Sequence, residues 1–237
     1  MIVAANLKTN LTRKETRAYV QSLESFKQNN SLDQDIFVFP ATSSLDDFQT
    51  SVTIGAQNAY PVENGAFTGE IGLDHLNEFA IKTILIGHSE RRHILGESQE
   101  VIAQKFKYFQ ELGFTIVYCV GEPLQMREAG VGEMMAYIDD QYKGIDTSYE
   151  KLIIAYEPVW AIGTGLTPTD EDILAIHREL KKKSKAPLLY GGSVKVNNAK
   201  EIMALKNVDG VLVGSAALNV EDFCQMATFA QELEKSN

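Results

Sequence analysis

Residues 152–165 read LIIAYEPVWAIGTG, and this stretch decides the fold. Its first five residues are apolar or β-favouring, as in a parallel strand that is covered on both faces. The strand ends on Glu157, which is followed by a proline and a tryptophan, and then by Gly163 and Gly165. A stiff position at one end and glycines at the other are typical of a loop that closes over a site. The stretch therefore predicts a buried parallel strand that places a carboxylate beneath a movable loop.

Seven other segments have the same apolar, β-rich character, with helical patterns between them. The eight predicted strands are Ile2–Leu7, Ile36–Phe39, Thr53–Gln57, Thr83–Gly87, Thr115–Val120, Leu152–Glu157, Leu188–Gly191 and Gly210–Gly214. The clearest predicted helices are Arg13–Gln28, Ser98–Leu112, Val131–Tyr142, Thr169–Lys183 and Asn219–Glu234. Eight such units, with no linker between them, are the size of an α/β fold in which residues 1–237 form one (β/α)8 barrel domain. A doubly wound open sheet is the alternative, which eight strands without a domain break disfavour.

The composition is that of a soluble globular protein, with 44% hydrophobic and 23% charged residues. Its net charge of −10 disfavours nucleic acid as a partner and requires any anionic substrate to be held by local groups. The apolar run Ile2–Ala5 is too short for a signal peptide or a membrane span. Cys119 and Cys224 form no disulfide pattern, so we expect a cytoplasmic protein. Walker A, GxGxxG and clustered metal-ligand patterns are absent, so we predict neither a cofactor nor a metal.

Glu157 has two interpretations. A lone glutamate at a strand end is most often exposed and paired at the surface. The loop residues after it favour another role, because a carboxylate that is dried beneath a closed loop is a stronger base. We therefore interpret Glu157 as a candidate general base.

The sequence GHSERR follows the fourth predicted strand and places His88 where a helix can begin. The positive end of a helix dipole favours a neutral imidazole, which can donate a hydrogen bond to a carbonyl oxygen. For a lone histidine the alternative is a capping or buried role beside a Glu–Arg ion pair. His75, His93 and His177 follow no predicted strand end, so we assign them structural roles.

Polar and small residues also follow the first, seventh and eighth predicted strands. Strand alternation puts Asn6 and Lys8 on one face, where an ammonium can neutralise a phosphate or an oxyanion. The turns around Ser193 and at Gly214-Ser215 can bring backbone N–H groups close to an anion. Taken singly, Lys8 is a solvated lysine and each glycine pair a turn. Together these groups predict cofactor-free proton transfer on a phosphorylated carbonyl compound.

From end to end the sequence resembles the triosephosphate isomerase family. The motifs that carry the resemblance are residues 6–8 (NLK), 56–60 (AQNAY), 64–70 (NGAFTGE), 86–92 (IGHSERR), 119–122 (CVGE), 155–165 (AYEPVWAIGTG) and 190–193 (YGGS). The segments around His88 and Glu157 are the most specific. The resemblance implies a TIM barrel enzyme of glycolysis and gluconeogenesis. Such an enzyme interconverts dihydroxyacetone phosphate and D-glyceraldehyde 3-phosphate through an enediolate, without a cofactor.

The resemblance also implies a role for each candidate residue. Glu157 would move the proton between the two carbons, and His88 would act on the oxygens as a neutral electrophile. Lys8 with Asn6 would stabilise the oxyanion, and Glu90 would bind Lys8. The phosphate would be held by backbone N–H groups of Gly163, Ser193, Gly214 and Ser215.

Three positions depart from the family pattern with small expected effects. Leu7 replaces an aromatic residue and should face away from the site. Leu166 replaces a lysine of the loop. Ser215 stands where a second glycine is usual, and its Cβ would make a positive φ costly. We expect a packing change at the first of these and a slightly altered phosphate cradle at the last.

Pro168 is the departure with the largest expected effect. In the family the backbone N–H at this position meets the hydroxyl that corresponds to Tyr190 when the loop closes. Proline has no N–H, so we expect this latch to be absent. The closed loop would then rely on Ser193 and the backbone of Gly165.

The loop Gln57–Glu70 holds the aromatic residues Tyr60 and Phe67. Long ordered loops are usually functional or interfacial, although Phe67 could also fold back onto its own barrel. In the family this loop inserts beside the neighbouring subunit's site, with Thr68 near Asn6. We therefore predict a homodimer through Gln57–Glu70.

Two other functions are the alternatives. Another phosphate-binding barrel enzyme, such as a lyase or a synthase, would need the base but not the loop of tryptophan and glycines beside it. A catalytically silent binding protein could keep the scaffold, but the presence of Glu157, His88 and Lys8 disfavours it.

Overall fold

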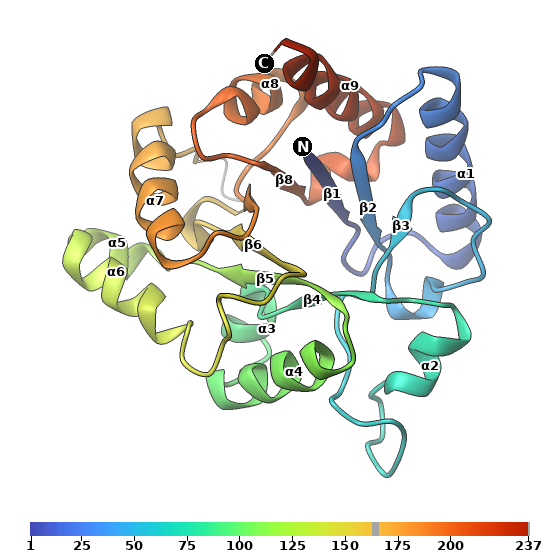
Figure 1. Cartoon of the computed structure of the whole chain (residues 1–237), viewed down its shortest axis with the longest axis horizontal. Helices are drawn as coiled ribbons and strands as arrows, with labels where there is room; N and C mark the ends of the chain where they lie inside the picture. Colours follow the sequence, from blue (N-terminus) through green and yellow to red (C-terminus); the bar gives the residue numbers. More distant parts are fainter. Residues whose placement is uncertain (163–165, 237) are drawn as a thin grey trace.

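The computed structural model describes residues 1–162 and 166–236, and its eight parallel strands form a nearly closed barrel surrounded by helices (Figure 1). The predicted (β/α)8 fold is confirmed. The strands are β1 (Ile2–Asn6), β2 (Asp35–Phe39), β3 (Thr53–Ile54), β4 (Thr83–Ile86), β5 (Thr115–Val120), β6 (Leu152–Tyr156), β7 (Leu188–Tyr190) and β8 (Gly210–Val213). They neighbour one another in the order β3-β2-β1-β8-β7-β6-β5-β4, which is sequential around the barrel once the ends meet.

The ends of this sheet meet at one bridge between Ala56 and Ile84. The Ala56 N–H donates to the Thr83 carbonyl oxygen at 2.9 Å, and the Leu85 N–H donates to the Ala56 carbonyl oxygen at 2.8 Å. Gly55 is required beside this bridge, because a Cβ there would lie 2.3 Å from the Phe39 ring. The third strand is thus shorter than the predicted Thr53–Gln57: Thr53 and Ile54 pair with β2, and Ala56 forms the bridge to β4.

Helices cover the outside of the barrel. They are α1 (Arg13–Asn29), α2 (Leu73–Glu78), α3 (Ser89–His93), α4 (Gln99–Glu111), α5 (Leu124–Glu128), α6 (Val131–Asp140), α7 (Asp170–Lys183), α8 (Val196–Ala204) and α9 (Val220–Ser236), with 3-10 turns η1 (Thr42–Ser44), η2 (Val159–Ala161) and η3 (Ser215–Leu218). The long helices begin where capping side chains occur: Thr12 and Thr169 each form a capping box. Among the described residues, no helix is long and apolar enough to cross a membrane.

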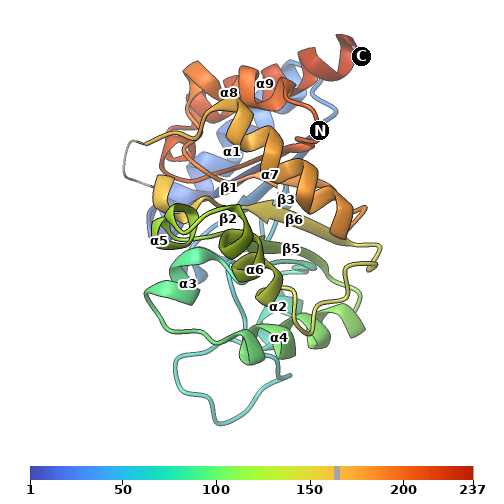
Figure 2. The ribbon, with the colours of Figure 1, turned by 90° about the vertical axis from the view of Figure 1, so that its left-hand side faces the viewer.

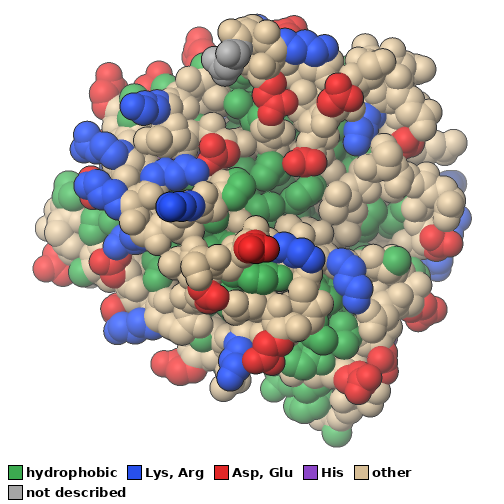
Figure 3. Space-filling model, in the orientation of Figure 1, with side chains coloured by type: hydrophobic (Ala, Val, Ile, Leu, Met, Phe, Trp, Pro, Cys, Tyr) green, Lys and Arg blue, Asp and Glu red, His purple; other side chains and the backbone are tan. Residues whose placement is uncertain are grey.

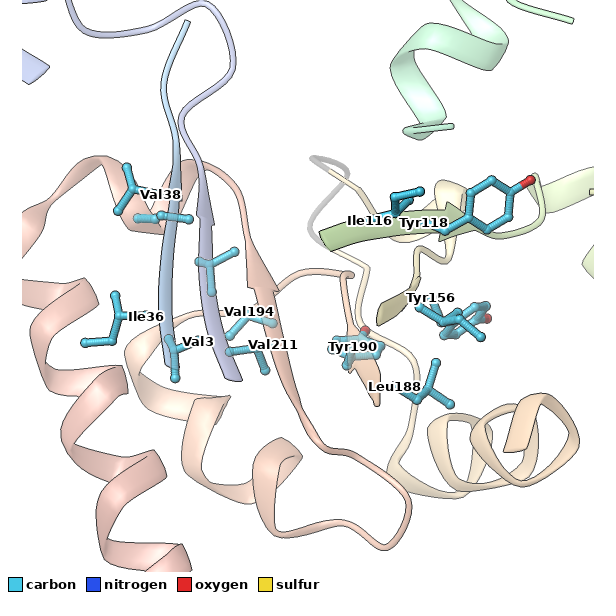
Figure 4. Close-up of a cluster of buried hydrophobic side chains, with 14 of the residues drawn as sticks. Val3, Ile36, Val38, Ile116, Tyr118, Tyr156, Leu188, Tyr190, Val194 and Val211 are labelled. Carbon is cyan, nitrogen blue, oxygen red and sulfur yellow. The ribbon is translucent and has the colours of Figure 1, made fainter. Parts of the chain in front are cut away.

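Strand alternation divides the core into two layers. One set of side chains fills the barrel interior: Ile2, Ala4, Phe37, Phe39, Leu85, Val117, Cys119, Ile153, Ala155, Leu189 and Leu212. The other set faces the helices, and Figure 4 shows part of it, with Val3 and Val211 on one side and Tyr156 and Tyr190 on the other. Leu7 belongs to this outer set, facing away from the site as expected.

The interior row continues past the carboxyl ends of the strands as polar or small residues. Asn6 follows Ala4 at a spacing of two, and Glu157 follows Ala155 in the same way. Gly191 and Gly214 continue the rows of Leu189 and Leu212. In Figure 2 the strands run away from the N-terminus toward this opposite end of the barrel. Figure 3 shows the other face, where hydrophobic side chains lie near the centre and charged ones around them.

Candidate functional site

A cavity of about 820 Å³ lies at the carboxyl ends of the strands. The predicted site residues that line it are Asn6, Lys8, His88, Glu157, Ser193, Gly214 and Ser215. Glu90 lines an adjoining cavity of about 1060 Å³, which shares Asn6, Lys8 and His88 with the first. Gly163 lies outside the described residues. The structure therefore brings the other eight predicted site residues into one region, although they come from strand ends far apart in the chain.

Glu157 and His88 are in direct contact. The distance from Glu157 Oε1 to His88 Nε2 is 2.9 Å, and Glu157 Oε2 accepts a hydrogen bond from the Ser89 N–H at 2.9 Å. Glu157 is 2% exposed and His88 6%. A buried carboxylate needs donors, and Glu157 finds both at the start of α3.

The hydrogen bonds of His88 define its tautomer. His88 caps α3, and its Nδ1 accepts a hydrogen bond from the Glu90 N–H at 3.2 Å. A nitrogen that accepts carries no proton, so the ring in this arrangement is neutral and Nε2 carries the hydrogen that points at Glu157.

The pKa of His88 depends on the position of Glu157. Burial lowers the pKa of the ring, but the carboxylates of Glu157 and Glu90 outweigh burial and raise it above the ordinary value. The net shift of the His88 pKa is therefore upward, although the helix dipole alone was predicted to favour the neutral ring. Removing the Glu157 carboxylate from the ring would leave burial dominant and favour the neutral imidazole.

The pKa of Glu157 shifts in the opposite direction. Burial alone would raise it, but His88, the Ser89 N–H and Lys8 stabilise the charged form and lower the pKa below its usual value. In this position Glu157 is a stable anion and a weak base. It becomes a stronger base on any movement that exchanges these partners for apolar surroundings.

Lys8 is held at the edge of the cavity by several contacts. Its ammonium forms an ion pair with Glu90, and its backbone N–H donates to Asn6 Oδ1 at 3.1 Å. Gln57 Nε2 donates to the Lys8 carbonyl oxygen at 2.7 Å. Lys8 has a φ of +53°, a left-handed conformation that costs a non-glycine residue about 1 kcal/mol. The surrounding contacts hold this strained backbone so that the side chain points along the cavity.

The loops after β7 and β8 form a second wall with little side-chain bulk. A Cβ on Gly214 would lie 3.5 Å from Lys8 Cε, so the ammonium stem lies close to this wall. Ser193 Oγ donates to the Ala161 carbonyl oxygen at 2.6 Å and so joins the loop after β7 to η2. Ser215 begins η3 without a positive φ, so the expected strain at this serine is not present.

Known proteins match this chain over its whole length. A family model described as triosephosphate isomerase matches residues 1–230. The triosephosphate isomerase of Sulfurimonas denitrificans is 64% identical over 237 residues, which is 100% of this chain and 99% of the relative. The triosephosphate isomerases of Sulfurovum sp. and Wolinella succinogenes are 58% and 57% identical, over 95% of this chain and 99% and 98% of their own. The chain belongs to the triosephosphate isomerase family. It is therefore an isomerase, as the sequence predicted.

A second buried carboxylate was not given a role by the sequence reasoning. Glu122 is 0% exposed and accepts hydrogen bonds through Oε1 from the Tyr156 hydroxyl at 3.0 Å and from Trp160 Nε1 at 2.9 Å. Burial raises the pKa of Glu122 above its usual value. The signal that could have found it is its position two residues beyond β5, close to the level at which Glu157 follows β6.

The ring of Tyr190 lies next to that of Tyr156, with the two centroids 6.5 Å apart. The Tyr190 hydroxyl is buried and finds no hydrogen-bond partner among residues 1–162 and 166–236, and burial raises its pKa. Pro168, which has no N–H, is itself buried. The absence of a latch between these two positions in a closed loop stays a prediction.

The segment between β3 and α2 projects from the barrel, as both ribbon views show (Figures 1 and 2). Tyr60 and Phe67 stack with ring centroids 4.5 Å apart, and Phe67 remains 40% exposed. Figure 3 shows hydrophobic side chains gathered over this projection. Within the described part of the chain, no group of three or more His, Cys, Asp and Glu side chains is arranged to hold a metal ion.

Proposed function

We propose that this isomerase interconverts dihydroxyacetone phosphate and D-glyceraldehyde 3-phosphate, with Glu157 as the base. The observation that carries the assignment is the buried Glu157–His88 contact of 2.9 Å in a cavity that also contains Lys8 and two glycine-bearing loops. The names of the relatives support the triose phosphate as substrate.

In the proposed reaction Glu157 leaves His88 and Ser89 and takes a proton from the carbon beside the carbonyl group. The electrons of that C–H bond form the carbon–carbon double bond of an enediolate, and the carbonyl oxygen takes the negative charge. His88 Nε2 gives its hydrogen to this oxygen and takes one from the hydroxyl group on the first carbon. Glu157 then returns its proton to the neighbouring carbon, and the new carbonyl group forms on the first carbon. Leaving its two donors removes the contacts that lower the pKa of Glu157, so the group is the stronger base when it meets the substrate.

The developing oxyanion would be stabilised by His88, Lys8 and Asn6. The Nε2–H of His88 is free to donate to the substrate oxygen once Glu157 has moved, and the Glu90 N–H keeps the ring in this tautomer. Lys8 supplies a positive charge that Glu90 orients through their ion pair. A neutral imidazole donates without the large pKa mismatch that an imidazolium would have.

The phosphate would be held by backbone N–H groups of Ser193, Gly214 and Ser215, and of Gly163 outside the described residues. Closure of the loop after Pro158 would exclude water, which strengthens these interactions and suppresses loss of phosphate from the enediolate. The Ser193–Ala161 hydrogen bond links the phosphate wall to the base of that loop.

We further infer a homodimer in the cytoplasm, with residues 1–237 of each subunit acting as one domain. The projecting loop Gln57–Glu70 exposes Phe67, and the cavity of about 1060 Å³ beside Asn6 and Lys8 has room for a loop tip. Insertion of the partner's loop would bury both surfaces. Sedimentation equilibrium should find a dimer at micromolar concentration, and Phe67→Asp should shift it toward monomer. An active wild-type monomer would overturn the proposal.

Replacing Glu157 by Gln tests the function. The variant should lose at least the ~10²–10⁴-fold in kcat that a general base contributes, because the amide cannot accept the proton. A coupled assay of glyceraldehyde 3-phosphate formation and consumption measures it. Glu111→Gln, which changes an exposed glutamate on α4, is the matched control and should keep wild-type turnover. Near-wild-type activity in Glu157→Gln would reassign the base.

A further inference from the structure

The cationic groups of the site cavity differ in whether they already form an ion pair. Among the described residues that line the cavity of about 820 Å³, two are lysines, Lys8 and Lys195. Lys8 is already paired with Glu90. Lys195 is exposed and forms no ion pair with the described residues. Its charge is therefore available to an incoming anion.

Lys195 lies in the loop after β7, next to the wall that would hold the phosphate. It is the N-cap residue of α8, two positions beyond Ser193. Asn198 Oδ1 accepts from the Lys195 N–H at 2.7 Å, and Asn198 Nδ2 donates to the Ser193 carbonyl oxygen at 3.1 Å. One side chain thus fixes the backbone of both Ser193 and Lys195, and Lys195 itself is exposed and lines the cavity.

The local charge balance makes this lysine important for a dianion. Glu157 and Asp222 also line the cavity, and the charge of Lys8 is offset by Glu90. The whole chain carries a net charge of −10. A phosphate dianion therefore approaches against repulsion, which a cation within the screening length of about 8–10 Å offsets.

We propose that Lys195 is a substrate-capture residue, whose ammonium draws the phosphate of the substrate into the wall formed by Ser193, Gly214 and Ser215. The inference rests on the proposed function for the identity of the substrate. Lys195 acts on the phosphate before and during binding, whereas Lys8 acts at the reacting oxygen. Its loss therefore affects capture and not the chemical step.

Lys195→Gln, with Lys206→Gln as the matched control, tests the proposal. Lys206 is also exposed and lies beyond the other end of α8, about 14 Å away by helix rise. Each variant replaces one lysine by a neutral residue, so both change the net charge equally. At low ionic strength Lys195→Gln should lower kcat/KM about 3- to 10-fold through KM, with kcat unchanged, and added salt should close the gap. Lys195→Arg should restore kcat/KM. Equal kcat/KM in the two glutamine variants at every ionic strength would overturn the proposal, as would a deficit that salt leaves unchanged.

Calorimetric titration with inorganic phosphate separates this inference from the proposed function. Phosphate should bind Lys195→Gln more weakly than wild type and Lys206→Gln, by a factor that shrinks with added salt. If the wild type isomerises triose phosphates but phosphate binds all three proteins equally, the capture role fails and the function stands. If phosphate affinity falls as expected but the wild type does not isomerise, the proposed function fails instead.

Discussion

Glu157 and Glu122 lie just beyond the ends of neighbouring strands, β6 and β5, and are equally hidden from solvent, at 2% and 0% exposure. Their partners differ. Glu157 accepts from an imidazole and from the Ser89 N–H and lies near the ammonium of Lys8. Glu122 accepts from a phenol and an indole through Oε1, and its Oε2 has no partner among the described residues.

The comparison shows that partners, and not burial, set the charge of a strand-end carboxylate in this barrel. Burial alone would raise both pKa values, but only Glu122 follows burial. His88, Ser89 and Lys8 reverse the direction for Glu157. The carboxylate inside the cavity is therefore kept anionic at rest, and the carboxylate outside it is the easier one to protonate.

The largest expected effect comes from shortening Glu157. Glu157→Asp keeps the charge but withdraws the carboxylate by about 1.5 Å, and a displacement near 1 Å can cost about 10²-fold. We expect kcat to fall by about 10² or more in the coupled assay. Glu122→Asp, which changes the carboxylate outside the cavity, should lower kcat less than tenfold. Equal losses in the two variants would contradict the separation of their roles.

The next largest effect should be an opposite pH dependence of stability when Glu157 and Glu122 are each neutralised. A carboxyl group whose pKa is lowered in the folded state stabilises the protein above the unfolded pKa of about 4.3, and this stabilisation is lost on acidification. A group whose pKa is raised stabilises the protein below that value, and this stabilisation is lost as the pH rises. Between about pH 3 and pH 7, the deficit of Glu157→Gln relative to wild type should therefore grow as the pH rises to about 4.3 and stay constant above it. Glu122→Gln should gain stability relative to wild type as the pH rises above about 4.3. Urea unfolding across this range measures both differences. Parallel curves for the two variants would show that the partners do not set the charge.

The smallest expected effects concern two tyrosine hydroxyls near Glu122. Tyr156→Phe removes a buried hydrogen bond and should cost about 0.5–1.5 kcal/mol in urea unfolding. Tyr190→Phe removes a buried hydroxyl without a described partner, so its stability should be equal to wild type or higher. Its turnover should stay within threefold of wild type, because Pro168 cannot provide a latch. A tenfold loss of turnover in Tyr190→Phe, with phosphate affinity unchanged, would show that a latch exists.

Much of the fold could be predicted because it depends on short-range patterns. Apolar runs located all eight strands, and the predicted helices Arg13–Gln28 and Thr169–Lys183 match α1 and α7 to within a residue at each end. The helices α5 and α8 were not predicted. α5 has only five residues, and α8 begins without a side chain that caps it as Thr12 caps α1. The closing bridge at Ala56 depends on distant strands meeting, which no local pattern encodes.

The residues of the candidate site could be predicted, but the contacts between them could not. Asn6 and Glu157 continue interior rows, so strand period and barrel geometry place them together. The direct contact between Glu157 and His88 could not be foreseen, because it depends on side-chain rotamers and on the donors that α3 happens to offer. The same holds for Glu122, whose partners lie 34 and 38 residues away.

The bridge at Ala56 has a mechanical consequence for the enzyme. β5 and β6 form five residue pairs, whereas among the described residues the segment after β3 pairs with β4 only at Ala56 and Ile84. Strand amides at this seam should exchange with deuterium sooner than those between β5 and β6, because fewer bonds must break to expose them. The projecting loop and the turn that carries His88 leave the barrel on either side of this seam. Contacts between two subunits on that side of the barrel would stabilise this single bridge. The imidazole of His88 would then be held most firmly in the assembled enzyme.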